Sequence, residues 1–387
     1  MEIVADENIP FVSKAFASLG EVRTFIGRQI NRADLGDAEV LLVRSVTQVD
    51  EKLLAGSAVR LVGTATIGTD HIDLDYLSKK NIAFASAQGS NATSAAEYVI
   101  SALLIIAERQ GFQLRDKTVG IIGCGNVGSR VLKKLKALGV ECIIHDPPLQ
   151  EKTANRNYVD LNTVLGADII TLHVPLTKAG RYPTEHLVNA DFLSKLQDQV
   201  VLVNTSRGAV VDEKALLERL VARPSMSAVL DVWKNEPNIN QLLLQRVALG
   251  TPHIAGYSFD GKVRGTEMLY AAACDYFQQT QQAQITLPAP PLRRLSFSSA
   301  IDDAAIQIAV MACYDVRRDD AALRRISTAP QASVYFDNLR KDYPMRREFS
   351  CVEIELPAEK SALAAQLRGL GFTVRFPRHH AHATFAP

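Results

Sequence analysis

A glycine-rich turn at residues 123–128 constrains the fold of this chain more than any other segment. Thr118-Val-Gly-Ile-Ile is typical of a buried strand, and Gly123, Gly125 and Gly128 follow it in G-x-G-x-x-G spacing before a helical pattern. The first glycine permits a tight turn, the second lets a pyrophosphate approach the backbone, and the third lets the helix pack closely. Amides at the helix start, including those of Asn126 and Val127, would attract phosphate groups. The segment therefore predicts a Rossmann unit that binds a dinucleotide.

Asp146 indicates which dinucleotide binds. It ends the next predicted strand, Glu141-Cys-Ile-Ile-His. A carboxylate at this position accepts hydrogen bonds from both ribose hydroxyls and repels a 2′-phosphate, and the prolines at 147 and 148 provide no arginine for such a phosphate. We therefore expect NAD rather than NADP. The alternative is an aspartate that only caps a turn.

Strand and helix patterns alternate on both sides of the glycine turn. Short apolar runs occur near residues 2–5, 39–43, 59–63 and 82–85 before the turn, and near 168–172, 200–203 and 227–230 after it. Such alternation predicts parallel sheets with helices on both faces. A stretch rich in Gln and Pro at 278–291 is typical of a linker, and helix and strand patterns beyond it predict a small α+β unit.

Composition excludes several classes of partner. The formal charge of +1 provides no large electrostatic footprint for nucleic acid or an anionic membrane, and the apolar run from Tyr98 to Ala107 is too short to cross a bilayer. Five scattered cysteines without a C-x-x-C pair favour a reducing cytoplasm over a disulfide framework or a zinc site. Three histidines at 379–382 lie near the chain end, where metal binding is not expected.

Three polar residues in turn-like segments after the glycine turn predict chemistry on an acid. Arg207 follows a buried strand, where its planar fork suits a carboxylate. His253 can take a hydroxyl proton, and a carboxylate such as that of Glu236 could orient its ring. The alternatives are a surface salt bridge for the arginine, a structural turn histidine and a solvated loop acid.

Polar loops also follow two strands of the N-terminal part. Arg44 and Ser45 follow one strand, and Thr66 lies in the loop after another. Hydroxyls and amides in such loops can bind an anion. The alternative is ordinary turn chemistry, with Asp73 capping a helix.

Ordered motifs over some two hundred residues resemble the D-isomer-specific 2-hydroxyacid dehydrogenases. These motifs are Thr66-Ile-Gly-Thr-Asp-His-Ile-Asp, Gly123 to Gly128, Leu172-His-Val-Pro-Leu-Thr, Ser206-Arg-Gly-Ala-Val-Val-Asp, Asp231-Val-Trp, Glu236-Pro and Thr251-Pro-His-Ile-Ala-Gly. The resemblance implies that Arg207 binds the substrate carboxylate, that Glu236 supports His253, and that His253 is the acid/base. It also implies cofactor contacts from Val174, Ser206, Gly208, Asp231 and Gly256, and substrate contacts from Ser45, Thr66 and Tyr257.

The resemblance also implies the architecture of the whole chain. We expect an α/β protein with two doubly wound parallel-sheet domains, a flavodoxin-like substrate-binding domain and a Rossmann NAD domain, plus a small α+β C-terminal domain. The expected boundaries are 1–93 with 257–285 for the substrate-binding domain, 94–256 for the NAD domain and 286–387 for the C-terminal domain.

Further motifs resemble one branch of the family, whose members act on a phosphorylated hydroxy acid and dimerise through the C-terminal domain. They include Val4-Ala-Asp-Glu-Asn-Ile-Pro and Tyr314-Asp-Val-Arg-Arg-Asp-Asp. We therefore expect a homodimer that oxidises such an acid. Two alternatives remain open: another 2-hydroxyacid dehydrogenase, such as one acting on phosphoglycerate, and an NAD-sensing protein without catalysis, like the related corepressors.

Overall fold

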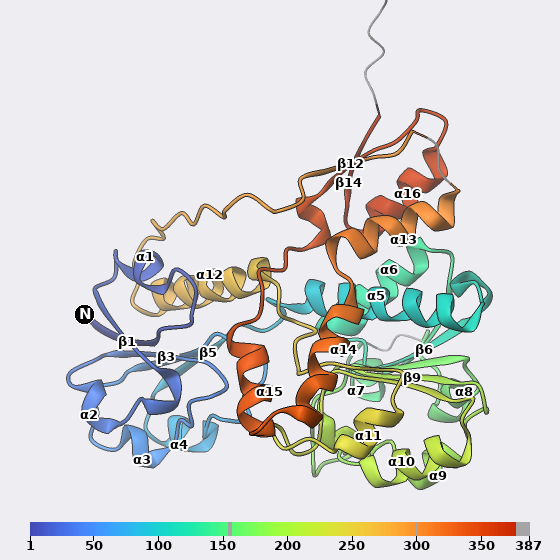
Figure 1. Ribbon diagram of the computed structural model, residues 1–387. Coiled ribbons are helices and arrows are strands. Elements are labelled where there is room, and N and C mark those ends of the chain that lie inside the picture. The colour runs from blue at the N-terminus through green and yellow to red at the C-terminus, as the bar shows by residue number, and fades with distance from the viewer. Residues whose placement is uncertain (154–156, 299–300, 377–387) are drawn as a thin grey trace, which may run out of the picture. The chain divides into compact units, whose positions relative to one another are not determined.

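The computed structural model describes residues 1–153, 157–298 and 301–376 (Figure 1). The chain divides into two compact units. The first unit comprises Met1–Ser94 and Gly256–Pro288, and the second comprises Ala95–Ala255 and Ala289–Pro387. Each unit contains a parallel sheet with helices, so the predicted α/β class is confirmed. The division into three domains at 1–93 with 257–285, 94–256 and 286–387 stays a prediction.

The first unit is built on a five-stranded parallel sheet in the order β2-β1-β3-β4-β5. This is the flavodoxin-like order. The strands are β1 (Glu2–Asp6), β2 (Glu21–Phe25), β3 (Val40–Val43), β4 (Leu61–Thr64) and β5 (Ala83–Ser86). The sequence patterns missed β2 because it is an edge strand with charged, partly exposed residues such as Glu21 and Arg23, rather than an apolar run.

Helices cover both faces of this sheet (Figure 1). On one face α1 (Val12–Phe16) and α12 (Phe259–Tyr276) pack on the side chains of Ile3, Ala5 and Leu42. The alternate residues of the same strands, such as Val4 and Leu41, face the other helices. Those helices are α2 (Arg32–Leu35), α3 (Glu51–Leu54) and α4 (Leu74–Lys79). Because successive side chains of a strand point to opposite faces of the sheet, the same strands contribute to two cores, one on each face.

The second unit contains a six-stranded parallel sheet in the order β11-β10-β9-β8-β6-β7. The strands are β6 (Thr118–Ile122), β7 (Glu141–His145), β8 (Ile169–Leu172), β9 (Val201–Asn204), β10 (Ser227–Leu230) and β11 (Leu249–Gly250). Tyr158 forms a single parallel bridge with Ile144 of β7, in the place that a third strand would take in the Rossmann order. The predicted Rossmann unit is therefore present with one strand reduced to a bridge.

Helices of the second unit follow the strands as expected. They are α5 (Ala92–Gln110), which begins in the first unit, α6 (Asn126–Ala137), α7 (Pro147–Thr153), α8 (Leu161–Leu165), α9 (Ala190–Ser194), α10 (Glu213–Ala222) and α11 (Gln241–Arg246). Helix α6 begins at Asn126 with Gly125 as the N-cap. The last residues of the glycine turn therefore form the first turn of the helix.

The C-terminal segment adds a three-stranded parallel sheet and four helices to the second unit. They are β12 (Arg294–Ser296), β13 (Glu353–Glu355), β14 (Thr373–Arg375), α13 (Asp302–Cys313), α14 (Val316–Arg324), α15 (Ala332–Lys341) and α16 (Ser361–Leu370). The sequence patterns missed α14 and α15. Leu323, Ile326 and Phe336 of this region are buried in the same core as Leu202 and Trp233 beside the six-stranded sheet.

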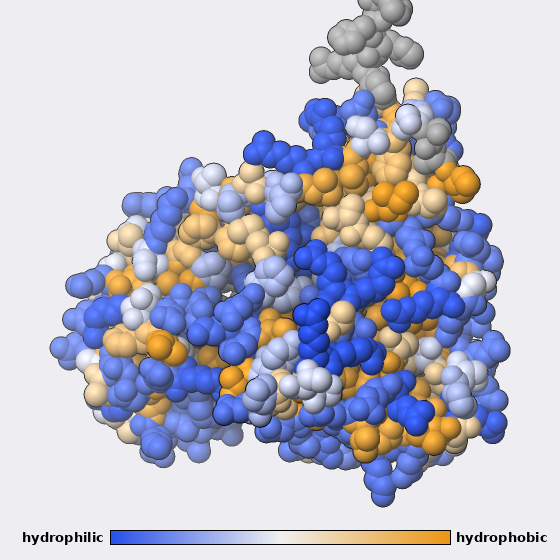
Figure 2. Space-filling model, in the orientation of Figure 1, coloured by the Kyte–Doolittle hydropathy of each residue, from blue (hydrophilic) through white to orange (hydrophobic). Residues whose placement is uncertain are grey.

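Single-turn 3-10 helices complete the described elements. They are η1 (Gly27–Gln29), η2 (Leu114–Asp116), η3 (Gly208–Val210), η4 (Arg325–Thr328) and η5 (Phe349–Cys351). No helix among the described residues is long and apolar enough to cross a membrane. Large apolar side chains are exposed in the C-terminal segment, and Figure 2 shows hydrophobic side chains at the surface there. They are Ile301, Ile308, Val334, Met345 and Phe376.

Candidate functional site

The glycine turn has the geometry that a bound dinucleotide requires. Gly123 has a φ of +86°, and a Cβ on it would lie 2.7 Å from the His173 carbonyl oxygen. A Cβ on Gly128 would lie 2.0 Å from the Gly123 carbonyl oxygen, so a glycine lets α6 pack against the turn. A Cβ on Gly125 would meet no atom within 4 Å. The open space at Gly125, beside the free amides of a helix start, fits the approach of a pyrophosphate.

Asp146 lies directly after β7 and is tied to the glycine turn. Its Oδ2 accepts from the Cys124 N–H at 2.7 Å, and its Oδ1 accepts from the Leu149 N–H at 3.0 Å. The turn-capping alternative is thus part of its role. A carboxylate has about four acceptor positions, so these two bonds leave capacity for ribose hydroxyls. The donor set fits NAD, and the residues that would hold it are those of the glycine turn and Asp146.

His173 lies beyond the end of β8, close to the glycine turn. Its Nε2 lies 2.9 Å from Thr171 Oγ1 and its Nδ1 lies 3.3 Å from Thr205 Oγ1. Desolvation lowers the pKa of His173 to about 3. The His173 imidazole is therefore neutral and structural, and its role differs from the one proposed for His253. Val174, a predicted cofactor residue, follows it and packs against the core and against the turn at Gly123.

Arg207 lies in a loop that Asn204 holds at the carboxyl end of β9. Asn204 is fully buried, its Oδ1 accepts from the N–H of Ser206 at 3.0 Å, and its Nδ2 donates to the Arg207 carbonyl at 3.0 Å. The Arg207 Nη1 donates to the Ser206 carbonyl at 2.8 Å. Asn204 was not among the predicted site residues, although a polar residue at the end of an apolar strand is a signal for such a role.

Gly208 brings this arginine loop against the next one. A Cβ at position 208 would lie 1.9 Å from the Trp233 carbonyl carbon, so only glycine fits there. The Trp233–Glu236 segment therefore passes directly over the start of η3. The contact explains a glycine after Arg207 by packing, whether or not Gly208 also lies beside a cofactor.

Glu236 and His253 form a direct pair. The His253 Nδ1 donates to Glu236 Oε2 at 2.7 Å, and Glu236 Oε1 accepts from the Trp233 N–H at 2.9 Å. Burial acts to raise the pKa of Glu236, but the His253 imidazole, the Trp233 N–H and the charge of Arg340 outweigh it and lower the pKa. The carboxylate therefore stays ionised beside the ring. The His253 side chain is 35% exposed, so its ring can be reached from solvent.

Asp231 fixes the loop that carries His253. It is buried, its Oδ1 accepts from Thr251 Oγ1 at 2.6 Å and from the Ile254 N–H at 2.8 Å, and its Oδ2 accepts from the Ala255 N–H at 2.9 Å. His253 itself has a φ of +58°, a conformation that costs a non-glycine residue energy and persists only when its surroundings impose it. The hydrogen bonds of Asp231 to the Ile254 and Ala255 N–H groups help to impose this conformation.

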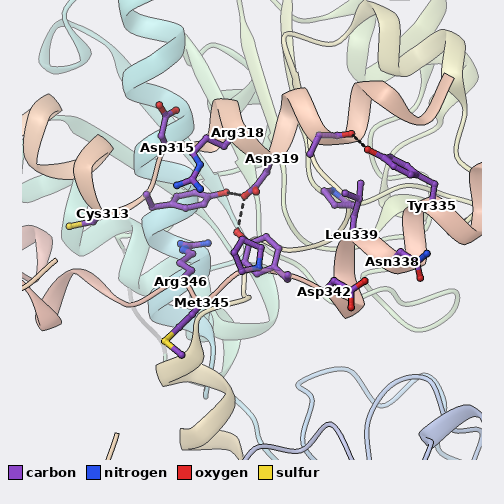
Figure 3. Close-up of a pocket in the computed structure, with 15 residues that line it drawn as sticks. Cys313, Asp315, Arg318, Asp319, Tyr335, Asn338, Leu339, Asp342, Met345 and Arg346 are labelled. Atoms are coloured by element: carbon purple, nitrogen blue, oxygen red, sulfur yellow. Dashed lines mark hydrogen bonds between the residues drawn. The ribbon is translucent and has the colours of Figure 1, made fainter. Parts of the chain in front are cut away.

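A cavity of about 430 Å³ is lined by this loop and by residues of the C-terminal segment (Figure 3). Pro252, which precedes His253, lines it together with residues of α14 and α15. Inside it the hydroxyls of Tyr314 and Tyr343 both donate to Asp319 Oδ2 at 2.8 Å. The guanidinium of Arg346 stacks 3.6 Å from the centroid of the Tyr314 ring. The cavity wall is thus a hydrogen-bonded assembly of C-terminal residues.

The predicted substrate residues belong to the first unit. Val43 of β3 pairs with Thr64 of β4, so Ser45 and Thr66 lie just beyond the carboxyl ends of neighbouring strands. Ser45 is exposed, and the Thr66 hydroxyl lies 2.8 Å from the Thr64 hydroxyl. Tyr257 precedes α12, with the Lys262 Nζ 4.5 Å from its ring centroid.

Gly256 begins the return of the chain to the first unit. A Cβ on it would lie 2.2 Å from Asn91 Nδ2, and its carbonyl accepts from the Ser94 hydroxyl at 3.2 Å. The structure places Arg207, Glu236, His253 and the glycine turn in the second unit, with Glu236 and His253 in direct contact, and Ser45, Thr66, Gly256 and Tyr257 in the first unit. The roles of all these residues in binding and catalysis stay predictions.

Metal ligation finds no support in the described part of the chain. No group of three or more His, Cys, Asp or Glu side chains there is arranged to hold a metal ion, and none of the five cysteines forms a disulfide. The histidines at 379–382 lie outside the described residues.

Comparisons with known proteins indicate the family of the chain. Residues 87–255 match the family described as D-isomer specific 2-hydroxyacid dehydrogenase, NAD binding domain, and residues 286–371 match a domain of unknown function. Erythronate-4-phosphate dehydrogenase of Hahella chejuensis is 47% identical over 379 residues, which cover 97% of this chain and 99% of the relative. The enzyme of the same name from Marinobacter nauticus is 46% identical over 383 residues, 97% of this chain and 100% of the relative.

Among solved structures, D-lactate dehydrogenase from Aquifex aeolicus, complexed with NAD and lactic acid, is similar in fold. It has a TM-score of 0.58 and 27% sequence identity, and the match covers 72% of this chain and 96% of that one.

Proposed function

Because the chain belongs to the erythronate-4-phosphate dehydrogenases, within the D-isomer-specific 2-hydroxyacid dehydrogenase family, we propose that it is an NAD-dependent oxidoreductase acting on 4-phospho-D-erythronate. The product is (R)-3-hydroxy-2-oxo-4-phosphooxybutanoate, and the role is in pyridoxine biosynthesis. The observation that carries the proposal is the 2.7 Å contact between Glu236 and His253, in the same unit as the glycine turn.

His253 is the proposed acid/base. Its Nδ1–H bond to Glu236 leaves Nε2 to accept the proton of the C2 hydroxyl, and the carboxylate stabilises the imidazolium that results. When bound, NAD supplies the acceptor for the hydride that leaves C2. Loss of the hydroxyl proton to His253 and of the C2 hydrogen with its electron pair converts the alcohol to a 2-oxo acid.

Arg207 is the proposed clamp for the substrate carboxylate. A guanidinium forms two parallel hydrogen bonds with a carboxylate, and its charge also stabilises negative charge that develops on the C2 oxygen. Asn204 and Gly208 hold the loop from which it projects. The arginine therefore orients the acid so that C2 is the carbon that reacts.

Substrate choice is assigned to the first unit. We propose that Ser45, Thr66 and Tyr257 bind the substrate through their hydroxyls. Arg44 is the proposed contact for the phosphate. Its Nε bonds to the buried carboxylate of Asp6 at 3.0 Å, which holds the guanidinium beside Ser45 at the end of β3.

A substrate panel tests the reaction. Purified protein with NAD should turn over 4-phospho-D-erythronate faster than 3-phosphoglycerate or D-lactate, followed by NADH absorbance. Faster turnover of 3-phosphoglycerate would make the chain another 2-hydroxyacid dehydrogenase. His253→Ala should lose at least about 100-fold in kcat while NAD still binds. Undiminished turnover by that variant would refute the acid/base role of His253, and NAD binding without any turnover by the wild type would favour the NAD-sensing alternative.

We also infer a cytoplasmic homodimer joined through the C-terminal segment. Five cysteines without a disulfide among them suit a reducing compartment. Exposed apolar side chains in the C-terminal segment, among them Ile301 at 80% exposure and Ile308 at 54%, suit a surface that a second copy covers (Figure 2). Light scattering should give a mass near twice the 42.3 kDa of one chain. Ile308→Asp should yield monomers, whereas a dimer unaffected by this change would refute the proposed interface.

A further inference from the structure

The loop that carries His253 follows the shortest strand of the six-stranded sheet. β11 consists of Leu249 and Gly250 alone and lies at the edge of the sheet. Its partner β10 satisfies one side, with the Thr251 N–H donating to the Leu230 carbonyl at 2.9 Å. An edge strand of two residues has little register of its own. The start of the His253 loop therefore needs a second support.

That support comes from α14 in the C-terminal segment. Asp320 is buried, and its Oδ1 accepts from the Gly250 N–H at 2.8 Å, on the edge that no strand of the described residues pairs with. Both oxygens of Asp320 also accept from Arg324 Nε at 3.0 Å. Arg324 in turn donates to the carbonyls of Leu244 and Val247 at 2.8 and 3.0 Å. The Asp320 carboxylate is thus hydrogen-bonded to the edge strand through Gly250 and to its own helix through Arg324.

The other end of the loop has a contact of the same kind. Arg346 is buried, and its Nη1 donates to the Ala255 carbonyl at 3.1 Å while its guanidinium stacks on Tyr314. Between these two ends, Pro252 lies against the cavity that Tyr314 and Asp319 line (Figure 3). C-terminal residues therefore contact residues 250, 252 and 255 of the loop, on both sides of His253.

We propose that Asp320, with Arg346, is a positioning residue for the acid/base His253, so that the C-terminal segment is part of the catalytic scaffold of its own chain. Neither residue touches the imidazole. Asp320 sets where the backbone of the loop begins, and Arg346 where it ends, and the strained backbone of His253 lies between them. The charge of Arg340 on α15, which helps to keep Glu236 ionised, comes from the same segment.

This proposal rests on the proposed function of His253 and deepens it. A misplacement of about 1 Å at a reacting group can cost about 100-fold in rate. If Asp320 acts by setting the position of the Gly250 N–H, then the position of its acceptor oxygen should matter more for kcat than its charge. Two substitutions at position 320 separate these properties.

Asp320→Glu keeps the charge that Arg324 binds but moves the acceptor away from the Gly250 N–H. Asp320→Asn keeps an acceptor oxygen in place and removes the charge. We expect Asp320→Glu to lower kcat by about 10-fold or more, with the Kd for NAD within about twofold of the wild type. Asp320→Asn should keep kcat within about threefold. The solvent deuterium isotope effect on kcat should rise only in Asp320→Glu, because proton transfer to His253 becomes slower relative to the other steps.

Asp303→Glu is the matched control. Asp303 of α13 pairs with Arg115 at 3.0 Å, so it also links the C-terminal segment to the Rossmann part, but both side chains are exposed and the 250–255 loop does not touch them. Its kcat and isotope effect should equal those of the wild type. Thermal melting of all three variants checks that they are folded.

The proposal is overturned if folded Asp320→Glu keeps wild-type kcat, if Asp320→Asn is the more damaged of the two, or if kcat and NAD binding fall together with an unchanged isotope effect. Failure of the proposed function looks different. In that case His253→Ala turns over phosphoerythronate as fast as the wild type, or the wild type does not turn it over at all.

Discussion

Two carboxylates of the second unit, Asp231 and Glu236, have the same chemistry and different surroundings. The oxygens of Asp231 accept three hydrogen bonds from Thr251, Ile254 and Ala255, so the residue holds a loop. Glu236 receives one backbone N–H at Oε1, and its Oε2 faces the His253 ring. We propose that the first carboxylate fixes the loop that carries the imidazole, and that the second orients the ring through its Nδ1.

Glu236→Gln should lower kcat by about 100-fold or more. The amide can still accept from the ring, but it carries no charge to stabilise the imidazolium. NAD binding, measured by fluorescence titration, should not change. Glu213→Gln is the control, because Glu213 is a nearby carboxylate whose Oε1 accepts from the Lys234 N–H at 2.8 Å rather than from the imidazole. Equal losses in the two variants would contradict a specific role for Glu236.

At the scale of elements, the junction of β6 and α6 separates two uses of glycine. Gly128 permits contact between the helix and the turn, whereas Gly125 faces open space with a φ of −72°. The first requirement belongs to folding and the second to a ligand. A Cβ at position 128 would meet the Gly123 carbonyl oxygen, whereas a Cβ at position 125 would meet only the proposed pyrophosphate.

Substitution with alanine should distinguish the two glycines. Gly125→Ala should leave the melting temperature unchanged and raise the Kd for NAD by at least about tenfold, since the new methyl group occupies the approach of the pyrophosphate. Gly128→Ala should lower the melting temperature, because its Cβ would lie 2.0 Å from a backbone oxygen. Calorimetry and NAD titration measure both quantities. A stable Gly128→Ala, or unaltered NAD affinity in Gly125→Ala, would refute these assignments.

α5 and α6 are joined by a buried charged pair. Glu97 Oε1 lies 3.6 Å from Lys134 Nζ, and the same oxygen accepts from the Phe349 N–H at 3.0 Å. Burial raises the pKa of Glu97 to about 7, although the charges of Lys134 and Arg346 act to lower it. The pair therefore connects both helices to the C-terminal segment through a carboxyl that titrates near neutral pH.

The stability of the protein should respond to this carboxyl. Below about pH 4.5 Glu97 is protonated in both states. As the pH rises from there to about 7, the unfolded chain releases the proton and the folded chain keeps it, so the folded state loses stability. Relative to Glu97→Gln, the free energy of unfolding should fall by up to about 3 kcal/mol over this window. Urea titrations at several pH values measure it.

Glu108→Gln is the control for this titration, because it removes an exposed carboxyl from the same helix. Its free energy of unfolding should follow that of the wild type across the window. A constant difference between the wild type and Glu97→Gln at every pH would contradict the prediction.

At the scale of the whole molecule, the C-terminal segment is part of the second unit. Leu323, Ile326 and Phe336 are buried in the core that also contains Leu202 and Trp233. Asp320 accepts from the Gly250 N–H at the edge of the sheet, and Arg324 donates to the Leu244 carbonyl of α11. A segment that supplies both core and edge contacts should unfold together with the sheet, not as an independent appendage.

Phe336→Ala should lower the free energy of unfolding by about 3–5 kcal/mol, the usual cost of removing a buried phenyl ring. The fluorescence of Trp233, the one tryptophan of the chain, reports on the Rossmann part. Its transition and the overall loss of helix by circular dichroism should shift together. A separate early transition of the C-terminal segment, with the tryptophan signal unchanged, would show that the segment folds alone.

Local patterns in the sequence predicted most of this fold. The apolar runs predicted nine of the eleven strands in the two larger sheets, because the residues of a buried parallel strand are consecutive in the sequence. Edge strand β2 and helices α14 and α15 were missed, since charged edge residues and helices whose apolar side chains pack on a distant sheet carry no strong local signal. Glu236 and His253 were predicted from residue type and resemblance, but not their 2.7 Å contact.

The sequence by itself determined the Rossmann turn, the cofactor class and the residue types of the proposed site, because each depends on a short segment with its own steric or chemical requirement. Only the tertiary structure decided which groups support that site. Asn204, Asp231 and Asp320 act through hydrogen bonds to backbone atoms, and in Asp320 the partner lies 70 residues away at Gly250. Such a bond depends on how the chain returns to a sheet edge, and no local pattern records that distance.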